Sequence, residues 1–258
     1  MRFRLRLHIN KQRHGNTLPF NYQYECSAVI YRIMARSDAA FAVWLHDNGF
    51  QSDRKQFKLF TYSRLHIPQY QVKGNNMKIL SDTIEWYISF LPEISTQQFI
   101  QGIFSEQTFE LGNKYNKIQC TVKSVEVVPP PHFTDTMRFN TLSPACVVLK
   151  HSDKSEEYIA PDHPEAPGLI LQNLMDKYRA LNGTEYPAEN IHFTLKTLTI
   201  PKPVLITIKA GTPEESRIRG FMGQLDISAP EPLMKIMYDG GIGSKNSMGF
   251  GCIDLYKK

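Results

Sequence analysis

Three consecutive prolines, Pro129-Pro130-Pro131, divide this sequence of 258 residues into two halves of similar length. Proline fixes one backbone dihedral and lacks the amide proton, so such a run can neither join a central strand nor continue a helix. It therefore marks a boundary between two domains. We expect a first domain over residues 1–128, a proline-rich linker over 129–136 and a second domain over 137–258.

The first half opens with strict alternation of apolar and basic residues. Phe3, Leu5, Leu7 and Ile9 share one face of residues 1–9, which predicts a half-buried strand with a basic outer face. That outer face carries Arg2, Arg4 and Arg6, which form a candidate track for phosphate groups. The expected elements of this half are a strand over 1–9, a helix that Asn21 caps and Ser37 ends, a short helix over 39–47 that Asp38 caps, a strand over 57–65, strand material over 78–90 interrupted at 81–82, a helix over 94–104, and a strand over 117–128.

The second half repeats this pattern without obvious sequence identity. Its expected elements are strands over 145–150, 191–200, 204–210, 218–227 and 250–255, with helices over 167–181 and 232–238. Strand, helix, strand, strand, helix, strand is the ferredoxin-like (RRM-like, βαββαβ) order. The predicted fold class is therefore α+β, with two tandem ferredoxin-like domains and a glycine-rich loop, residues 240–251, before the last strand.

The glycine-rich loop holds five of the fifteen glycines of the chain. Glycine lacks the side chain that would keep a polyanion away from backbone N–H groups. Neither nucleotide-binding pattern, GxxxxGK[ST] nor GxGxxG, is present in register. Two interpretations stay open, a loop that binds a ligand and a hairpin in which glycine serves geometry alone. The candidate ligand-binding residues are Gly241, Gly243, Ser244, Lys245, Asn246, Gly249 and Gly251.

Net charge and cysteine spacing restrict the class of protein. The formal net charge of +5 permits nucleic-acid binding without requiring it. The four cysteines have no CxxC spacing, and the histidines form no HExxH pattern, so we expect buried thiols and neither a metal site nor a cofactor. The longest apolar run, residues 39–45, is too short to span a membrane. We therefore expect a soluble, cytoplasmic protein.

Three residues of the first half stand out by type: Tyr31, His46 and Lys58. A phenol, an imidazole and an ammonium can together move protons and neutralise phosphate charge without a metal. Each also has an ordinary structural interpretation, as a packing residue, a helix cap or a solvated cation. Residue type alone does not decide between the two.

Several segments resemble one known family. The run from Gly241 to Gly251 is similar to the signature loop of the CRISPR-associated endoribonucleases that process precursor guide RNA, within the repeat-associated RNA-binding (RAMP) superfamily. Residues 18–24, 28–31, 42–46 and 57–63 resemble the N-terminal blocks of that family in the same order. The resemblance covers nearly the whole chain, and the loop is its most specific part.

The resemblance implies an activity and a set of partners. It implies a metal-independent endoribonuclease that cuts CRISPR repeats of precursor crRNA by attack of the 2′-hydroxyl, leaving 2′,3′-cyclic phosphate and 5′-hydroxyl ends. Tyr31, His46 and Lys58 occupy the positions of catalytic residues in similar members. Lys55 and Arg54 are alternatives to Lys58, because the segment after His46 is longer here than in some members. Precursor and mature crRNA, subunits of a CRISPR effector complex and a second copy of this chain are the partners that the resemblance allows.

Two rival functions stay open from the sequence. A noncatalytic member of the same superfamily would bind guide RNA as a subunit of an effector complex. An unrelated RRM-type module would stack bases on aromatic residues of its sheet, but the first strands here lack the aromatic RNP pattern. Cleavage of a repeat RNA separates the enzyme from both rivals.

Overall fold

The alternating segment forms the central strand of the first sheet, as predicted. The computed structural model describes residues 1–53, 55–187, 189 and 191–256. In it, β1 (Arg2–Ile9) lies between β8 (Thr83–Phe90) and β10 (Lys117–Val128), antiparallel to both. Its four alternating apolar side chains are buried against helices, since alternate residues of a strand point to the same face.

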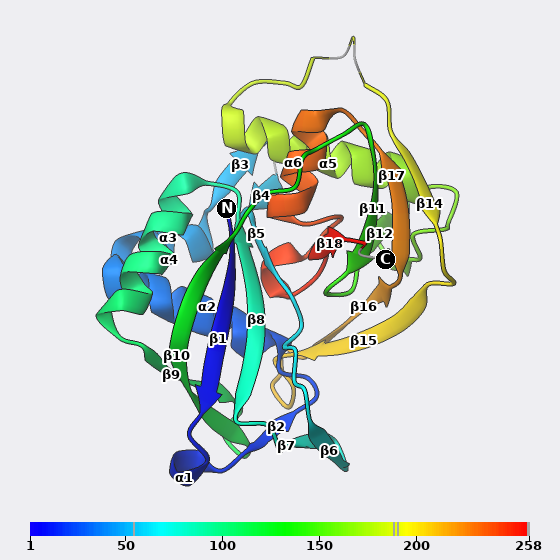
Figure 1. The fold of residues 1–258 in the computed structure, drawn as a ribbon. Coiled ribbons are helices and arrows are strands. Elements are labelled where there is room, and N and C mark those ends of the chain that lie inside the picture. Colours follow the sequence, from blue (N-terminus) through cyan, green and yellow to red (C-terminus); the bar gives the residue numbers. More distant parts are fainter. Residues whose placement is uncertain (54, 188, 190, 257–258) are drawn as a thin grey trace.

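The first domain has the predicted ferredoxin-like topology. Its sheet has the order β5-β8-β1-β10-β9, and the elements β1, α2, β5, β8, α4 and β10 follow the βαββαβ pattern. Helices α2 and α4 cover one face (Figure 1). The remaining bounds are α1 (Lys11–His14), β2 (Thr17–Pro19), α2 (Gln23–Ser37), α3 (Ala39–Asp47), β3 (Phe50–Ser52), β4 (Lys55–Phe57), β5 (Phe60–Tyr62), β6 (Tyr70–Lys73), β7 (Asn76–Ile79), α4 (Glu93–Ser105) and β9 (Thr108–Gly112).

The second domain repeats this topology. Its sheet has the order β14-β17-β11-β18, and helices α5 and α6 pack on one face of it (Figure 1). Tandem ferredoxin-like domains are therefore confirmed. The bounds are β11 (Thr136–Thr141), β12 (Val147–Lys150), β13 (Glu156–Ile159), α5 (Ala166–Asn182), β14 (Thr194–Thr197), β15 (Lys202–Ile208), β16 (Ser216–Met222), β17 (Gln224–Ser228), α6 (Glu231–Gly240), the 3-10 helix η2 (Asn246–Met248) and β18 (Ile253–Leu255).

Two predicted strands of the second half form, but their places in the sheets differ from the expected ones. The first strand of its sheet is β11, whereas the predicted strand over 145–150 contains β12, which pairs with β13 in a separate hairpin. The predicted strand over 218–227 is broken at Gly223 into β16 and β17, and β16 pairs with β15 outside the main sheet. Only alternate residues of β11 are buried, and it begins five positions after Pro131, so its sequence resembles a continuation of the linker.

The helix caps agree with the sequence in one case and differ in another. Asp38 caps α3 as predicted, because its Oδ1 accepts a hydrogen bond from the Phe41 amide at 2.9 Å. Asn21 is not the N-cap of α2: Tyr22 occupies that position, and its side chain makes no capping hydrogen bond. The Asn21 Oδ1 instead accepts from the Thr207 amide at 3.4 Å, a contact between the two domains.

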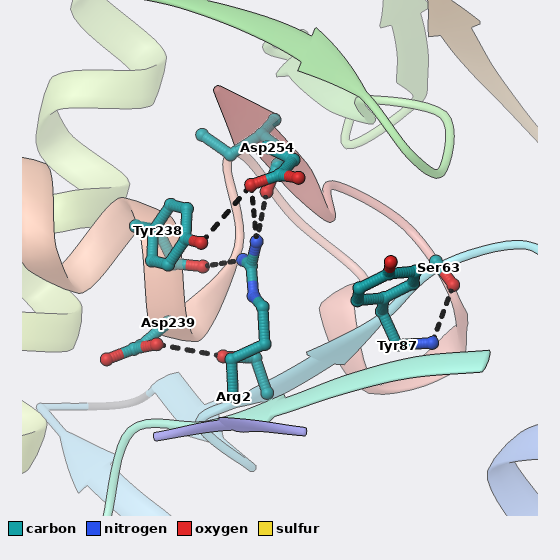
Figure 2. Close-up of polar contacts among 8 residues, drawn as sticks. Arg2, Ser63, Tyr87, Tyr238, Asp239 and Asp254 are labelled. Carbon is teal, nitrogen blue, oxygen red and sulfur yellow. Dashed lines mark hydrogen bonds and ion pairs between the residues drawn. The ribbon is translucent and has the colours of Figure 1, made fainter. Parts of the chain in front are cut away.

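Arg2 joins the two domains and does not belong to an exposed phosphate track. Its side chain is buried, and its guanidinium donates to the Ile253 carbonyl at 2.8 Å and to the Tyr238 carbonyl at 2.6 Å. It also lies 3.6 Å from the centroid of the Tyr238 ring and 3.5 Å from Asp254 (Figure 2). The prediction for Arg2 was wrong because the second domain covers this end of β1.

The cysteines and the helices agree with two further expectations. Cys26, Cys120, Cys146 and Cys252 are all buried and free. Within the described residues, no helix has both the length and the apolar composition that a membrane span requires.

Candidate active site at the domain interface

Helices α2 and α3 bring Tyr31 and His46 together. Asp38 ends α2 in an extended conformation and caps α3, so the chain turns and the second helix packs back against the first. Tyr31 lies in the middle of α2, and His46 lies in the last turn of α3. Their ring centroids are 5.2 Å apart at an interplanar angle of 79°, an edge-to-face contact.

A backbone kink places Lys58 beside this pair. The predicted strand over 57–65 is interrupted after β4, and Leu59 has a φ of 53°, a left-handed conformation that is costly for a branched side chain. The Lys58 Nζ donates to the His46 carbonyl at 2.7 Å. Gly49 lies against Lys58: a Cβ at Gly49 would sit 3.0 Å from the Lys58 Cδ. The structure therefore brings Tyr31, His46 and Lys58 into one cluster.

Burial and neighbouring charges give these groups different proton affinities. Burial raises the pKa of Tyr31 well above its usual range, and a hydrogen bond with the Ser247 side chain offsets part of that shift. The phenol is therefore neutral at physiological pH. Burial lowers the pKa of Lys58, and the Asp47 carboxylate partly opposes this change. The side chain of His46 is 68% exposed, and its Nδ1 lies 2.8 Å from the Asp47 Oδ1.

Of the two alternative cations, Lys55 lies away from His46. The Lys55 Nζ pairs with the Asp176 carboxylate of α5, across the domain interface, and not with His46. Arg54 lies outside the described residues. Arg179 of α5 pairs with Asp53 at 2.7 Å, so the β3–β4 hairpin is held against α5 by two ion pairs. Among the described residues Lys58 donates to the His46 carbonyl, and its catalytic role stays a prediction.

The glycine-rich loop closes the site from the second domain. The Ser27 hydroxyl of α2 donates to the Ser247 carbonyl at 2.7 Å, and the Thr61 hydroxyl of β5 donates to the Phe250 carbonyl at 3.0 Å. These bonds fix the loop to α2, the helix that carries Tyr31, and to β5. Because the loop belongs to the second domain, both domains contribute to the candidate site.

The glycines of the loop allow other segments of the chain to pack closely against the loop backbone. A Cβ on Gly243, where φ is +67°, would lie 2.3 Å from the Cys146 carbonyl oxygen, and one on Gly249 would lie 2.8 Å from the Tyr62 ring. The Asn246 amide donates to two carbonyls of its own loop, those of Ile242 and Phe250, at 3.1 Å each.

Burial divides the seven predicted ligand-binding residues into two groups. The buried residues are Gly241, Gly243, Asn246, Gly249 and Gly251, whereas Ser244 and Lys245 are partly exposed. Binding of RNA by these residues stays a prediction.

Lys177 also holds this loop, and the sequence analysis missed it. Its side chain is only 1% exposed, and its Nζ donates to the Gly241 and Gly243 carbonyls at 2.6 and 3.0 Å. Burial lowers the pKa of Lys177 to about 7. The sequence did contain a sign that Lys177 is buried. It continues the apolar stripe of α5 that contains Ile170 and Leu174, and a solvated lysine is not expected on that face.

Family models identify the class of protein that this fold and site define. A model described as "CRISPR associated protein Cas6, C-terminal" matches residues 128–255, and one described as "CRISPR-associated protein Cas6, N-terminal" matches residues 17–125. Because the two models together match nearly the whole chain, it belongs to the Cas6 family of CRISPR-associated proteins. This agrees with the resemblance noted from the sequence.

Individual relatives extend this result over nearly the full length. The CRISPR-associated endoribonuclease Cas6 of Pyrococcus furiosus is 27% identical over 99% of this chain and 90% of its own length. An endoribonuclease Cas6 of Methanocaldococcus jannaschii is 24% identical over 98% of this chain and 93% of its own length.

Solved structures share the fold. One of a Cas6-related protein from Pyrococcus furiosus has a TM-score of 0.82 at 22% identity, with 100% of this chain and 99% of the other covered. A RAMP protein described as binding different RNA substrates has a TM-score of 0.80 at 22% identity, with both chains fully covered.

Proposed function

We propose that this protein is a metal-independent endoribonuclease that cuts within the CRISPR repeats of precursor crRNA. Membership of the Cas6 family and the names of its curated relatives support RNA cleavage. The cluster of Tyr31, His46 and Lys58 supports a mechanism that uses side chains alone. The observation that carries the proposal is the contact of both Tyr31 and Lys58 with His46.

In the proposed reaction the RNA supplies its own nucleophile. The 2′-hydroxyl oxygen forms a bond to the adjacent phosphorus while the bond from phosphorus to the 5′-oxygen of the next nucleotide breaks. The products are a 2′,3′-cyclic phosphate and a 5′-hydroxyl end. One proton leaves the 2′-hydroxyl, and one is delivered to the departing 5′-oxygen.

The three side chains divide this work according to their environments. His46 is exposed beside a carboxylate and carries out proton transfer, because imidazole exchanges protons near neutral pH. Tyr31 stays protonated and orients the 2′-hydroxyl or donates to the 5′-oxygen. Lys58 stabilises the charge that grows on the nonbridging phosphate oxygens.

RNA binding is proposed to use the exposed part of the glycine-rich loop. Lys245 and Ser244 offer an ammonium and a hydroxyl at the surface, and such contacts to phosphate fix the position of an RNA. The buried residues Gly241, Gly243, Asn246, Gly249 and Gly251 support binding indirectly, since they hold the loop in place. Subunits of an effector complex and a second copy of the chain stay predicted partners.

The test is cleavage of a repeat RNA in the presence of EDTA by wild type, His46→Ala and His151→Ala. His151 is a matched control, because it is also exposed and lies 3.2 Å from a carboxylate, that of Glu157. We expect His46→Ala to slow cleavage by about 10² to 10⁴-fold and His151→Ala to cleave normally. Equal rates for His46→Ala and wild type, or a strict need for a divalent ion, would contradict the proposal.

A noncatalytic RNA-binding subunit is the second candidate function. It is favoured by one observation: a relative in Pyrococcus horikoshii, 25% identical over 92% of this chain, is named a putative endoribonuclease-like protein, Cas6nc. The same assay separates the two functions. Repeat RNA that is bound but recovered intact from wild-type protein would favour the second, whereas fragments with cyclic phosphate ends would favour the first.

A further inference from the structure

A pocket of about 730 Å³ opens between the two domains beside the proposed catalytic cluster. The first domain contributes β4 and the segment from Lys58 to Phe60, and the second contributes β12 and one face of α5. The loop from Gly243 to Met248 forms a further wall. Its volume falls within the range of small-molecule sites, about 300–1,000 Å³. The proposed chemistry leaves this pocket without a role.

The pocket adjoins the cluster through shared side chains. Lys58, a member of the cluster, lines the pocket, as do Phe60 and Ser247, which both neighbour Tyr31. The Phe60 ring centroid lies 5.7 Å from that of Tyr31, and the Lys58 Nζ bonds to the His46 carbonyl. A nucleotide next to a phosphate held at Lys58 would therefore lie at the mouth of the pocket.

The lining combines apolar walls with polar groups, as a nucleobase requires. Phe57, Leu149, Leu169 and Ile170 supply apolar surface on which a base can pack. Asn173 of α5 lines the same space, and its Oδ1 is buried with no hydrogen-bond partner among the described residues. An unpaired buried carbonyl oxygen is costly, and a ligand N–H group would satisfy it.

The charged groups at the rim suit a phosphate-linked ligand. Two carboxylates, those of Glu156 and Glu165, line the pocket together with the lysines, and Glu156 is paired with Lys150 at 3.5 Å. Lys245 lines the pocket from the loop. Ammonium groups of both domains, those of Lys58 and Lys245, thus line the space beside which the backbone of a strand would pass.

We infer that this pocket holds the base of one nucleotide next to the cleaved phosphate, turned out of the RNA stack. The inference rests on the proposed function and extends it, because it assigns a base-reading role to α5 of the second domain. The Asn173 carbonyl oxygen accepts a hydrogen bond, so the pocket favours a base that presents an N–H donor toward α5. Phosphate contacts position the strand, and this base contact adds sequence preference.

The test is an abasic scan. A set of repeat RNAs, each lacking one base near the cleavage site and carrying a 2′-deoxy nucleotide there to prevent cleavage, is titrated against four proteins. These are wild type, Asn173→Ala, the pocket-filling Leu169→Trp, and Asn182→Ala. Asn182 is a matched control on the same helix, and its amide donates to the Tyr178 carbonyl away from the pocket. Thermal unfolding of each variant checks that it is folded.

We expect one abasic position to weaken binding to wild type and to Asn182→Ala by about tenfold. The same RNA should lose about twofold or less with Asn173→Ala and Leu169→Trp, which already lack the base contact. The inference would be overturned if Asn173→Ala and Leu169→Trp bound every RNA of the set more weakly by one common factor and still lost about tenfold in affinity for the abasic RNA.

This outcome is distinguishable from failure of the proposed function. Binding to the uncleavable RNA is measured whether or not the protein cuts, and the His46→Ala assay reports cleavage separately. If cleavage depends on His46 but the abasic loss at every position is the same in wild type and in the pocket variants, the base pocket alone is wrong. If no RNA is cut but one position couples to Asn173, the pocket stands and the protein is an RNA-binding subunit.

Discussion

The two domains share one topology but differ in the connections between their strands. In the first, the connection from α2 to β5 contains α3 and the β3–β4 hairpin, and it carries His46 and leads to Lys58. In the second, the connection from α6 to β18 is the glycine-rich loop. The common βαββαβ frame therefore positions the site, whereas the differing connections supply its chemistry and its closure. The first domain has the connection with His46 and Lys58, and the second has the glycine-rich loop.

The largest expected effect is on the interface that joins the two domains. Arg2→Met removes the donor from two buried carbonyls, those of Ile253 and Tyr238, and should lower the free energy of unfolding by about 3–5 kcal/mol. Urea denaturation measures this change. Arg4→Met is the control, since Arg4 pairs with Glu126 in solvent, and it should leave the urea midpoint nearly unchanged. Equal midpoints for the two variants would show that the domains are held by other contacts.

The next effect tests the connection in the first domain. Lys58→Ala should slow cleavage by about 10² to 10³-fold, because it removes the charge that is proposed to stabilise the reacting phosphate. Burial lowers the pKa of Lys58, so its ammonium is present at low pH and is lost as pH rises, earlier than for an ordinary lysine.

The pH dependence of cleavage separates this charge from a packing role. Because Lys58 loses its charge as pH rises, the cleavage rate of wild type should fall at alkaline pH. The cleavage rate of Lys58→Arg, whose side chain stays charged, should not fall there. A flat wild-type profile on the alkaline side, or an unaffected Lys58→Ala rate, would assign the charge to another residue.

A smaller effect tests the connection in the second domain. Gly243→Ala forces a Cβ to 2.3 Å from the Cys146 carbonyl oxygen at a positive φ, and should cost about 1–3 kcal/mol of stability. Gly168→Ala is the matched control in α5, where an added Cβ meets nothing within 4 Å. Thermal unfolding compares them. If Gly243→Ala proved as stable as Gly168→Ala, the loop would be looser than its packing indicates.

The smallest effect concerns the exposed part of the loop. Lys245→Ala should weaken RNA binding and lower the slope of log affinity against log salt by about one, as expected for one lost phosphate contact. Fluorescence anisotropy at several salt concentrations measures the slope. Lys196→Ala, on β14, is a control outside the loop and the pocket and should leave the slope unchanged. An unaltered slope for Lys245→Ala would leave the loop with a packing role alone.

Features that depend on local sequence were predictable from the chain. The alternation of residues 1–9 predicted β1, and Asp38 was recognised as a helix cap, because both depend on near neighbours. Tyr31, His46 and Lys58 were selected by type and by family resemblance, and residue spacing alone could not bring them together. Their meeting depends on the packing of α2 against α3 and on the unusual φ of Leu59.

Features that depend on the second domain were not predictable in this way. Arg2 and Lys177 look like solvated cations in sequence, and both are buried by segments far along the chain. Strand β11 was missed because its pattern is short and half polar. The sequence left two interpretations of the glycines open, a ligand loop and a purely geometric role, and it could not show that Gly243 packs against Cys146 and Gly249 against Tyr62. A single sequence does not reveal which polar or glycine residues another domain will cover.

The contacts of Arg2 also set an order of events as the chain folds. Residues separated by 251 positions must meet before this interface closes, and contacts of such long range are slow to form. Tyr31, His46 and Lys58 lie within one domain and can assemble earlier, whereas Ser247 reaches Tyr31 only once both domains have docked. A newly synthesised molecule therefore completes the contact between the glycine-rich loop and Tyr31 in the final stage of folding.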